Sequence, residues 1–578
     1  MRICRTIIKN YRNLKNIDVE LSEIVSLIGA NNSGKSNFLC ALSIPLSADD
    51  NPSGKRLSWY DINRETKEKY YEFLNDNKLR IINKTITVQE FTDVIPYVEI
   101  TLYFLPDENE HYDIKDILVS KSPWIGGIKY IFRVKNPEQL LDRVQCIMNS
   151  EDGEIKNRMS LLPMDLFDYS ITVPERDNNI SYETLTGFRT VSLPAERDNF
   201  ASSADKLSSK ALSGLLQKHL TPEAEDKIEK AYASFFETVK AESNLDTIMN
   251  WQDYTDIPNA QAFFEQISIL PNMPQMSSIL NNIKLGYQDD YMFAQGLGHR
   301  NLVLMTVILH SYLSQERNIS YRLMTVEEPE AHLCCSNVLL MVSLFNLFSK
   351  KTKYTQIVYS THNVELVNKI GLDKVILFHN GEAFSLNKAL SPKERDYLVA
   401  NPNTDIFKVL YSKKVILVEG ITEEILIKSY LQTRNDLNDI KVLSFHKGFI
   451  KIIDIWKKLN SHTENKLGVV RDSDNEPKPQ AEHESRQDEH VIVRTTSGYT
   501  LETDLTKANF ELLKKEYGDI YGWNDMTEEQ LQADWRTKKS DVILRICHDL
   551  VNGSITGFSL PPHIQEIIDF MQEETSGD

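Results

Sequence analysis

The stretch Ile24-Val-Ser-Leu-Ile-Gly29-Ala-Asn-Asn-Ser-Gly34-Lys35-Ser36 decides how the first half of the chain folds. A short apolar run at residues 24–28 predicts a strand, and the residues after Gly34 have helical character until Pro45. The pattern G-x-x-x-x-G-K-[ST] between a strand and a helix predicts a loop that binds nucleotide phosphates. Its glycines let backbone N–H groups turn toward phosphate oxygens at a helix N-terminus.

Each side chain of this loop has an expected task. Lys35 neutralises the β- and γ-phosphates, and the Ser36 hydroxyl is a ligand of Mg²⁺. Asn31, Asn32 and Gly34 complete the expected nucleotide contacts. A chance match to the whole pattern in a chain of this length has odds of about 2%. We therefore predict that the first half of the chain binds ATP.

A second group of motifs predicts the hydrolytic side of the same site. The apolar strand at residues 323–326 leads into Glu327 and Glu328, at the strand end where ligands gather in open α/β sheets. Glu327 is expected to hold Mg²⁺, and Glu328 to orient the attacking water. His362 follows another apolar strand, at residues 356–359, and is expected near the γ-phosphate. Taken alone, two glutamates at a strand end are usually solvated, and a lone histidine is more often a cap or core residue.

A glycine pair precedes the acidic strand. Gly296 and Gly298 lie in Gln295-Gly-Leu-Gly-His-Arg-Asn301, ahead of a helix expected at residues 302–313. Helix N-termini attract anions, and in ABC-type enzymes this element contacts the γ-phosphate of the opposite protomer. The pair therefore predicts an ATP-bridged homodimer, although an isolated glycine pair is a weak signal.

Carboxylates dominate the C-terminal part. A buried-type strand at residues 415–418 ends in Glu419-Gly420, with Glu423 one turn later. About fifty residues on, the strand at residues 467–470 precedes Asp472-Ser-Asp474. If the two strands are neighbours, four carboxylates gather around Mg²⁺ or Mn²⁺, with Glu419 as a bridging ligand or base. A single acidic cluster would usually be surface decoration, but this pair of strand ends matches a Toprim fold.

Composition and length set the limits. The chain has 578 residues and a net charge of −18, so two or three domains are expected and a general nucleic-acid coat is excluded. Six cysteines without a C-x-x-C pair, and an N-terminus without an apolar leader, favour the reducing cytoplasm. The apolar stretch at residues 339–348 is too short to cross a bilayer, so no membrane association is expected.

The pattern along the chain predicts several further segments. Residues 50–200 favour a β-rich lobe with insertions, and residues 204–245 favour two helices around a break at Thr221-Pro222. No heptad repeat persists, which excludes a long coiled-coil arm. The main boundary is expected between residues 390 and 412, and the polar insert at residues 475–498 is expected to be a loop.

The motifs occur in an order that resembles the OLD (overcoming lysogenization defect) nuclease family. The matching segments are KNYRNL at residues 9–14, the phosphate-binding loop, VSLPAERD at residues 191–198, the glycine pair, VEEPEAHL, STHN and the two acidic strand ends. The resemblance implies an α/β chain with two domains. The first is an ABC-type P-loop ATPase domain at residues 1–400, with an inserted helical dimerisation segment at about 204–250; the second is a Toprim nuclease domain at residues 410–578.

The same resemblance implies further site residues. Glu502 corresponds to an additional acidic residue of the family's Toprim domains, and Lys538 or Lys539 to a late lysine that stabilises the transition state. Basic residues between the acidic motifs either follow a nucleic-acid backbone or form the exposed face of an amphipathic helix; they are Lys441, His446, Lys447, Lys451, Lys457 and Lys458.

As a whole, the resemblance implies an ATP-regulated, metal-dependent DNA endonuclease that acts as a homodimer or dimer of dimers in bacterial anti-phage defence. Its expected partner is a reverse transcriptase with its RNA–DNA hybrid, as in retrons, or a helicase-like subunit, as in Gabija-type systems. One alternative is an ATPase switch that binds nucleic acid through a non-cleaving Toprim domain. Another is a topoisomerase or primase, for which the sequence lacks a recognisable tyrosine-bearing module.

Overall fold

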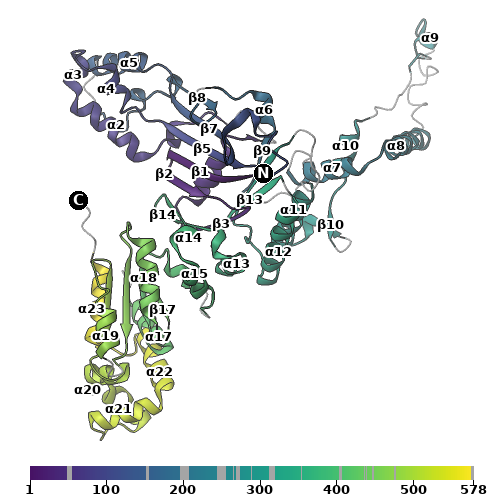
Figure 1. Ribbon diagram of the computed structural model, residues 1–578. Coiled ribbons are helices and arrows are strands. Elements are labelled where there is room, and N and C mark those ends of the chain that lie inside the picture. Colours follow the sequence, from purple (N-terminus) through teal and green to yellow (C-terminus); the bar gives the residue numbers. More distant parts are fainter. Residues whose placement is uncertain are drawn as a thin grey trace. The chain divides into compact units, whose positions relative to one another are not determined.

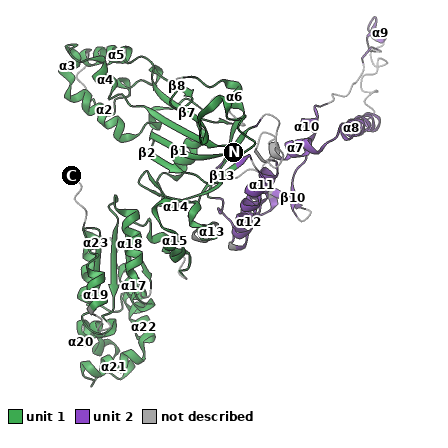
Figure 2. Ribbon diagram, viewed as in Figure 1, with its two compact units in different colours: residues 1–192, 320–328, 356–578 green, residues 193–319, 329–355 purple. Residues whose placement is uncertain are grey.

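The structure of the protein is a computed structural model, and it divides into two compact units (Figure 2). Residues 1–192, 320–328 and 356–578 form the first unit; residues 193–319 and 329–355 form the second. The structure describes residues 1–48, 55–150, 155–176, 178–194, 207–243, 256–264, 266–267, 274–287, 290–311, 319–352, 354–401, 406–434, 437, 439–445, 448–473 and 477–573.

An antiparallel sheet opens the first unit. Its strands lie in the order β2-β1-β5-β7-β6, and β8 also pairs with β7 (Figure 1). Buried and exposed residues alternate along β2, as expected for a strand with one face on a core. The segment KNYRNL, residues 9–14, covers the end of β1, the turn and the first residue of β2. The bounds are β1 Arg2–Tyr11, β2 Leu14–Glu20, β5 Val98–Leu105, β6 Leu118–Lys121, β7 Trp124–Val134 and β8 Phe167–Thr172.

A second sheet carries the phosphate-binding loop. Its order is β15-β14-β3-β13-β12-β9-β4, and β3 pairs in parallel with both β13 and β14. Every residue of β3 is buried, which explains why the strand is apolar apart from Ser26. The loop after β3 leads into helix α1, Lys35–Ser43. The strands are β3 Ile24–Gly29, β4 Ser47–Ala48, β9 Phe188–Leu193, β12 Tyr321–Glu327, β13 Thr355–Ser360, β14 Val375–His379 and β15 Glu382–Ser385.

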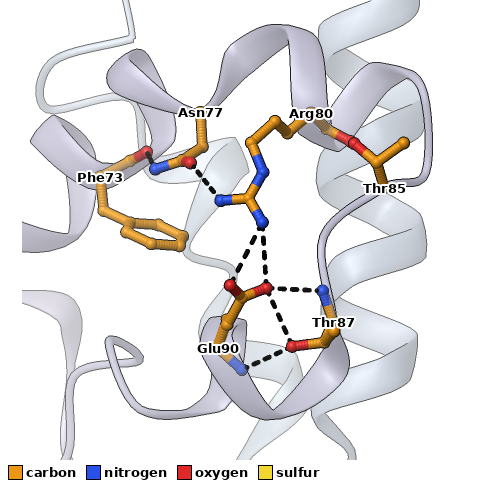
Figure 3. Close-up of polar contacts among 6 residues, drawn as sticks. All are labelled: Phe73, Asn77, Arg80, Thr85, Thr87 and Glu90. Carbon is orange, nitrogen blue, oxygen red and sulfur yellow. Dashed lines mark hydrogen bonds and ion pairs between the residues drawn. The ribbon is translucent and has the colours of Figure 1, made fainter.

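Short helices interrupt the β-rich lobe, as the sequence predicts. They are α2 Arg64–Asp76, α3 Lys78–Ile82, α4 Val88–Thr92, α5 Pro137–Ser150 and α6 Tyr182–Thr186. One carboxylate joins α3 to α4 (Figure 3). Glu90 accepts from the backbone N–H and hydroxyl of Thr87 in a capping box, and it accepts from Arg80 at 3.2 Å. The hydrogen bonds from Thr87 and Arg80 lower the pKa of Glu90 to about 2.

The second unit is largely helical. Its elements are α7 Leu207–His219, α8 Pro222–Glu242, α9 Ala260–Phe264, α10 Met276–Leu280, β10 Gly286–Tyr287, β11 Asp290–Tyr291, α11 Leu297–Ser311 and α12 Cys335–Lys351. The predicted helix break is confirmed: Thr221 caps α8 by accepting from the N–H of Ala224 at 3.3 Å, with Pro222 at the first helical position. Residues 244–250 of the expected helical segment lie outside the described residues.

A third sheet, within the first unit, follows residue 413. Its strands lie in the order β17-β16-β18-β19, and every pair is parallel. Helices cover it. The bounds are β16 Lys414–Val418, α17 Ile421–Gln432, β17 Ile440–Ser444, α18 Phe449–Asn460, β18 Lys466–Arg471, α19 Pro477–Glu484, β19 Val491–Thr495, α20 Leu501–Tyr521, α21 Glu528–Thr537, α22 Lys539–Val551 and α23 Pro562–Gln572.

The prediction of a loop at residues 475–498 is wrong. This segment contains helix α19 and strand β19, which extends the parallel sheet by pairing with β18. The connection between α19 and β19 is polar and is held by tertiary partners: Arg486 pairs with Asp454 of α18 at 3.0 Å, and Asp488 pairs with Lys457 at 2.6 Å. Sequence periodicity does not register such contacts.

Four helices that follow β13 and precede the third sheet contribute to one buried cluster with residues of the second and third sheets. They are α13 Val364–Ile370, α14 Leu386–Ala389, α15 Pro392–Val399 and α16 Ile406–Val409. The cluster includes Leu377 of β14, Phe407 of α16 and Leu417 of β16. His379 adds a polar contact, because its Nε2 lies 3.0 Å from the carbonyl of Leu410. Among the described residues, no helix is both long enough and apolar enough to cross a membrane.

Candidate functional site

Gly29 and Gly34 of the phosphate-binding loop leave no room for a side chain. Gly34 has a φ of 117°, and a Cβ there would lie 2.8 Å from Leu14 Cδ2. A Cβ on Gly29 would lie 2.4 Å from the carbonyl oxygen of Phe378 in β14. Both backbones therefore approach their neighbours more closely than any other residue allows. This close packing shapes the loop between β3 and α1.

Lys35 turns back over the loop. Its Nζ donates to the carbonyl oxygens of Gly29 at 2.9 Å and Ala30 at 2.7 Å. Burial lowers the pKa of Lys35 to about 8, although the charge of Glu328 opposes the shift. The next residue, Ser36, is exposed in the first turn of α1, and Asn31 and Asn32 are exposed in the loop. Lys35, expected to contact phosphate, and Ser36, expected to bind the metal, are thus consecutive at one helix N-terminus.

Residues that sequence reasoning did not assign brace this loop from the β1–β2 turn. The amide of Asn13 donates to the carbonyl of Asn32 at 3.1 Å and accepts from Asn37 of α1 at 2.8 Å. Arg12 donates to the same Asn37 at 3.0 Å. Both bracing residues belong to KNYRNL, whose position in the order of motifs was the only sequence signal for them.

The acidic strand end and the histidine lie near enough to the loop lysine for their charges to interact. Glu328, just after β12, has a φ of 39°, and its N–H donates to the carbonyl of Ser360 at 3.0 Å. The Nε2 of His362 lies 3.6 Å from Glu328 Oε1. Burial and the positive charge of Lys35 lower the pKa of His362. The predicted grouping of Lys35, Glu328 and His362 is therefore present in the structure, and Glu327 is the last residue of β12.

The glycine pair lies in the second unit. Helix α11 begins at Leu297, five residues before the expected start, so Gly298 is inside its first turn. A Cβ at Gly298 would lie 2.3 Å from the carbonyl of His332, whereas one at Gly296 would meet nothing within 4 Å. Asn301 donates to the carbonyl of Ala331 at 3.2 Å. Gly298 is thus needed for close packing of this helix against residues 331–332.

The predicted neighbours in the third sheet are confirmed. Val418 of β16 pairs with Val470 of β18 in parallel, so Glu419 and Asp472 follow adjacent strands at the same edge of the sheet. Burial and the negative charges of Glu423 and Glu419 raise the pKa of Asp472 to about 7. Glu423 is buried in the first turn of α17, where burial raises its own pKa. These carboxylates repel one another, as expected for groups arranged around a cation.

The remaining members of this cluster come from α20 and α22. Glu502 is 1% exposed, and its Oε1 lies 2.8 Å from the Nζ of Lys539. Burial alone would lower the pKa of Lys539, but its contact with Glu502 and the nearby charges of Glu423 and Asp472 raise it. Lys538 instead pairs with Asp534 at 2.8 Å. The geometry therefore separates two lysines that sequence reasoning left equivalent.

The oxygen donors of this cluster fit a hard divalent cation. Oε2 of Glu423 and Oε2 of Glu502 are buried and have no hydrogen-bond partner among the described residues. As the side chains stand, the described part of the chain holds no group of three acidic, histidine or cysteine residues close enough to share one metal. Asp474, an expected ligand, lies outside the described residues.

The expected basic track is mostly engaged in other contacts. Lys457 pairs with Asp488 at 2.6 Å, Lys458 pairs with Glu394, and Lys451 lies over the ring of Tyr397. His446 and Lys447 lie outside the described residues. The opposite face of α18 is buried in the core, so this helix fits the amphipathic alternative better than a nucleic-acid track.

Comparison with protein families agrees with both sites. Residues 1–367 match the family model described as AAA ATPase domain, and residues 410–474 match the model described as overcoming lysogenization defect protein-like, TOPRIM domain. The fold and sites therefore define a P-loop ATPase joined to a Toprim domain. The chain belongs to the AAA ATPase domain family and, with its OLD-like TOPRIM domain, to the OLD-type ATPase–Toprim proteins. ATPase domains use nucleotide and Toprim domains use divalent metal.

Two relatives carry a functional name. Endonuclease GajA of Bacillus cereus strain VD045 is 21% identical over 440 residues, which cover 75% of this chain and 68% of the relative. Endonuclease GajA of Bacillus cereus strain HuB5-5 is 22% identical over 372 residues, which cover 55% of this chain and 52% of the relative. The chain thus spans between about half and two thirds of the length of these relatives.

Among solved structures, the SMC head bound to the C-winged helix domain of ScpA is 15% identical, with a TM-score of 0.31 over 67% of this chain and 99% of that one. The SMC head domain from Thermotoga maritima is 12% identical, with a TM-score of 0.27 over 66% of this chain and 97% of that one. Because both TM-scores are this low, the fold assignment depends on the family matches.

Proposed function

We propose that the protein is an ATP-regulated, metal-dependent DNA endonuclease. The observation that carries the proposal is the acidic cluster at one edge of the parallel β16–β18 pair, with Lys539 reaching into it. Buried carboxylates that raise one another's pKa are unfavourable in a purely structural role, because each charge costs free energy without a cation. Two relatives named endonucleases support the same chemistry.

In this proposal the Toprim residues divide into metal ligands and a cation for the transition state. Glu419, Glu423, Asp472, Asp474 and Glu502 would hold Mg²⁺ or Mn²⁺, and Glu419 would serve as a ligand or as the general base. Such ions supply polarisation of the attacking water and of the leaving 3′ oxygen. Lys539 places its ammonium where negative charge develops on the phosphate, which lowers the barrier electrostatically.

The nucleotide site acts as the control element. Asn31, Asn32, Gly34 and Lys35 bind the phosphates of ATP, and Ser36 and Glu327 hold its Mg²⁺. Glu328 orients the attacking water, and His362 responds to the γ-phosphate. Gly296 and Gly298 bind the nucleotide of a second protomer, which makes a homodimer, or a dimer of dimers, the working assembly.

The biological role that fits best is the effector of a bacterial anti-phage system in the cytoplasm. A helicase-like subunit, as in Gabija-type systems, is one partner class. A reverse transcriptase with its RNA–DNA hybrid is the other partner class. The domain bounds proposed are 1–400 for the ATPase, with its helical segment at about 204–250, and 410–578 for the Toprim domain.

Plasmid cleavage tests the proposal. Purified protein is incubated with supercoiled DNA while Mg²⁺ or Mn²⁺ is titrated, with and without ATP. The double variant Asp472→Ala with Asp474→Ala should lose cleavage and keep ATP hydrolysis, whereas Lys35→Ala should lose nucleotide binding. If the wild type cuts DNA in no nucleotide state while it hydrolyses ATP, the endonuclease proposal fails and a non-cleaving ATPase switch replaces it.

A further inference from the structure

A cavity of about 490 Å³ lies in the first unit, outside both sites described above. Its walls come from β4, β8, β9, α6 and the segment that contains Lys55. Pockets of roughly 300–1,000 Å³ are the size that holds small organic ligands. Neither the phosphate-binding loop nor the acidic cluster contributes a residue to this cavity.

Hydrogen bonds hold the walls in place. The hydroxyl of Ser47 on β4 donates to the carbonyl of Leu185 at 2.9 Å, and Nε of Arg189 on β9 donates to the carbonyl of Thr186 at 3.1 Å. On the other side, the N–H of Ile180 donates to the carbonyl of Ile171 at 3.0 Å. The cavity is therefore preformed, so a ligand need not order its walls on binding.

The charge of the cavity is opposite to that of the chain. Lys55 and Arg189 line it, and none of the described residues that line it is acidic, although the net charge of the protein is −18. Nζ of Lys55 has a long contact of 3.5 Å to the carbonyl of Pro45, and burial lowers its pKa to about 8. A half-buried ammonium and a guanidinium that line the same cavity favour a dianionic group such as phosphate.

Aromatic and amide groups complete the cavity. Tyr182 lines it with a side chain that is 74% exposed, so its ring is accessible to a planar ligand. Tyr169 also lines it and is held by stacking on Tyr130, with ring centroids 5.7 Å apart. Asn179 adds an amide that can both donate and accept hydrogen bonds. Planar rings that stack, together with an amide, suit a nucleobase.

We propose that this cavity binds a nucleoside monophosphate, at a site separate from the ATP site. Lys55 and Arg189 contact the phosphate, Tyr182 stacks on the base, and Asn179 hydrogen-bonds to the base edge. Two cations match the charge of one phosphate monoester, which favours a monophosphate over a triphosphate. This inference does not depend on the proposed endonuclease activity.

Isothermal titration of full-length Lys35→Ala with AMP, GMP, CMP and UMP tests the site, because this background removes binding at the phosphate-binding loop. We expect one nucleotide per chain. Adding Lys55→Met should weaken binding at least tenfold, whereas adding Lys121→Met, which removes an exposed lysine of β6, should leave it unchanged. Tyr182→Ala changes an exposed side chain, so it should fold normally and lose the preference for nucleotide over inorganic phosphate.

Three results would overturn the assignment. The first is the absence of nucleotide binding in the Lys35→Ala background, or binding that Lys55→Met leaves intact in a protein with an unchanged melting temperature. The second is an affinity for inorganic phosphate equal to that for the nucleotides, which would show that the base contributes nothing to binding. The third is tighter binding of a 5′-phosphorylated oligonucleotide than of any mononucleotide. Plasmid cleavage by the wild type is read separately, so failure here leaves the endonuclease proposal untouched.

Discussion

Nζ of Lys539 lies 2.8 Å from Oε1 of the buried Glu502, which ties the start of helix α22 to the acidic cluster of the parallel sheet. The neighbouring Lys538 caps the end of α21 and pairs with Asp534 instead. Lys538 thus forms an ion pair with Asp534, whereas the next residue, Lys539, contacts the carboxylate cluster. This difference gives the proposed nuclease site a matched pair of variants.

Lys539→Ala should reduce metal-dependent DNA cleavage by about a hundredfold or more, because a cation aimed at developing charge contributes on that scale. Lys538→Ala should change the cleavage rate by less than about threefold, because its ion pair with Asp534 lies outside the carboxylate cluster. Cleavage rates at saturating Mg²⁺ measure both, and ATP hydrolysis should stay at the wild-type rate in each. Equal rates for the two variants would remove Lys539 from the proposed mechanism.

Asn13→Ala should weaken ATP binding without abolishing turnover. The substitution removes two hydrogen bonds that hold the phosphate-binding loop against α1, each contributing about 1 kcal/mol. We expect KM for ATP to rise roughly five- to tenfold while kcat changes little. Asn16→Ala, at an exposed position of β2, is the matched control. A large fall in kcat with unchanged KM would contradict the bracing role.

Glu423→Gln should stabilise the metal-free protein. Burial raises the pKa of Glu423, so its ionised form is disfavoured in the fold at neutral pH, and the neutral amide removes that cost. We expect the free energy of unfolding in EDTA to rise by about 1 kcal/mol. The same variant should lose the gain in melting temperature that Mg²⁺ or Mn²⁺ gives the wild type. A fall in stability in EDTA would argue against the repulsion described.

Acidic pH should destabilise the fold through His379. Burial lowers the pKa of this histidine, and because a carbonyl only accepts, Nε2 carries the hydrogen toward Leu410. The unfolded chain takes up a proton below about pH 6.5 that the folded chain resists, so stability is lost as the pH falls through that value. Denaturant unfolding measures the free energy of unfolding at pH 7.5 and at pH 5.5. The decrease between the two should be up to about 1 kcal/mol smaller for His379→Gln than for the wild type.

A substitution that changes no titratable group provides the control for that experiment. Asn16→Gln, at an exposed position of β2, should leave the pH dependence of unfolding unchanged. His379→Gln keeps a donor near the carbonyl of Leu410, so its stability at pH 7.5 should stay close to that of the wild type. Parallel curves for His379→Gln and wild type would show that His379 does not couple the fold to pH.

Much of the architecture could be predicted because it depends on local pattern. The loop between β3 and α1 follows from glycine spacing, since Gly34 must adopt a φ of 117°, and the break at Thr221-Pro222 follows from capping. Buried strands such as β3 and β16 follow from short, mainly apolar runs. In contrast, α19 and β19 were missed because they flank a polar connection, and its residues Arg486 and Asp488 are held by partners on α18.

By itself, the sequence determined the order of the motifs, the types of side chain at each strand end and hence the class of chemistry, because these depend on residue identity and short spacing. Only the tertiary structure decided that Lys539 rather than Lys538 meets Glu502, that Asn13 braces the loop at Asn32, and that Lys55 and Arg189 share a cavity. Those relationships join residues far apart in the chain, and a long separation along the chain does not reveal which residues meet in space.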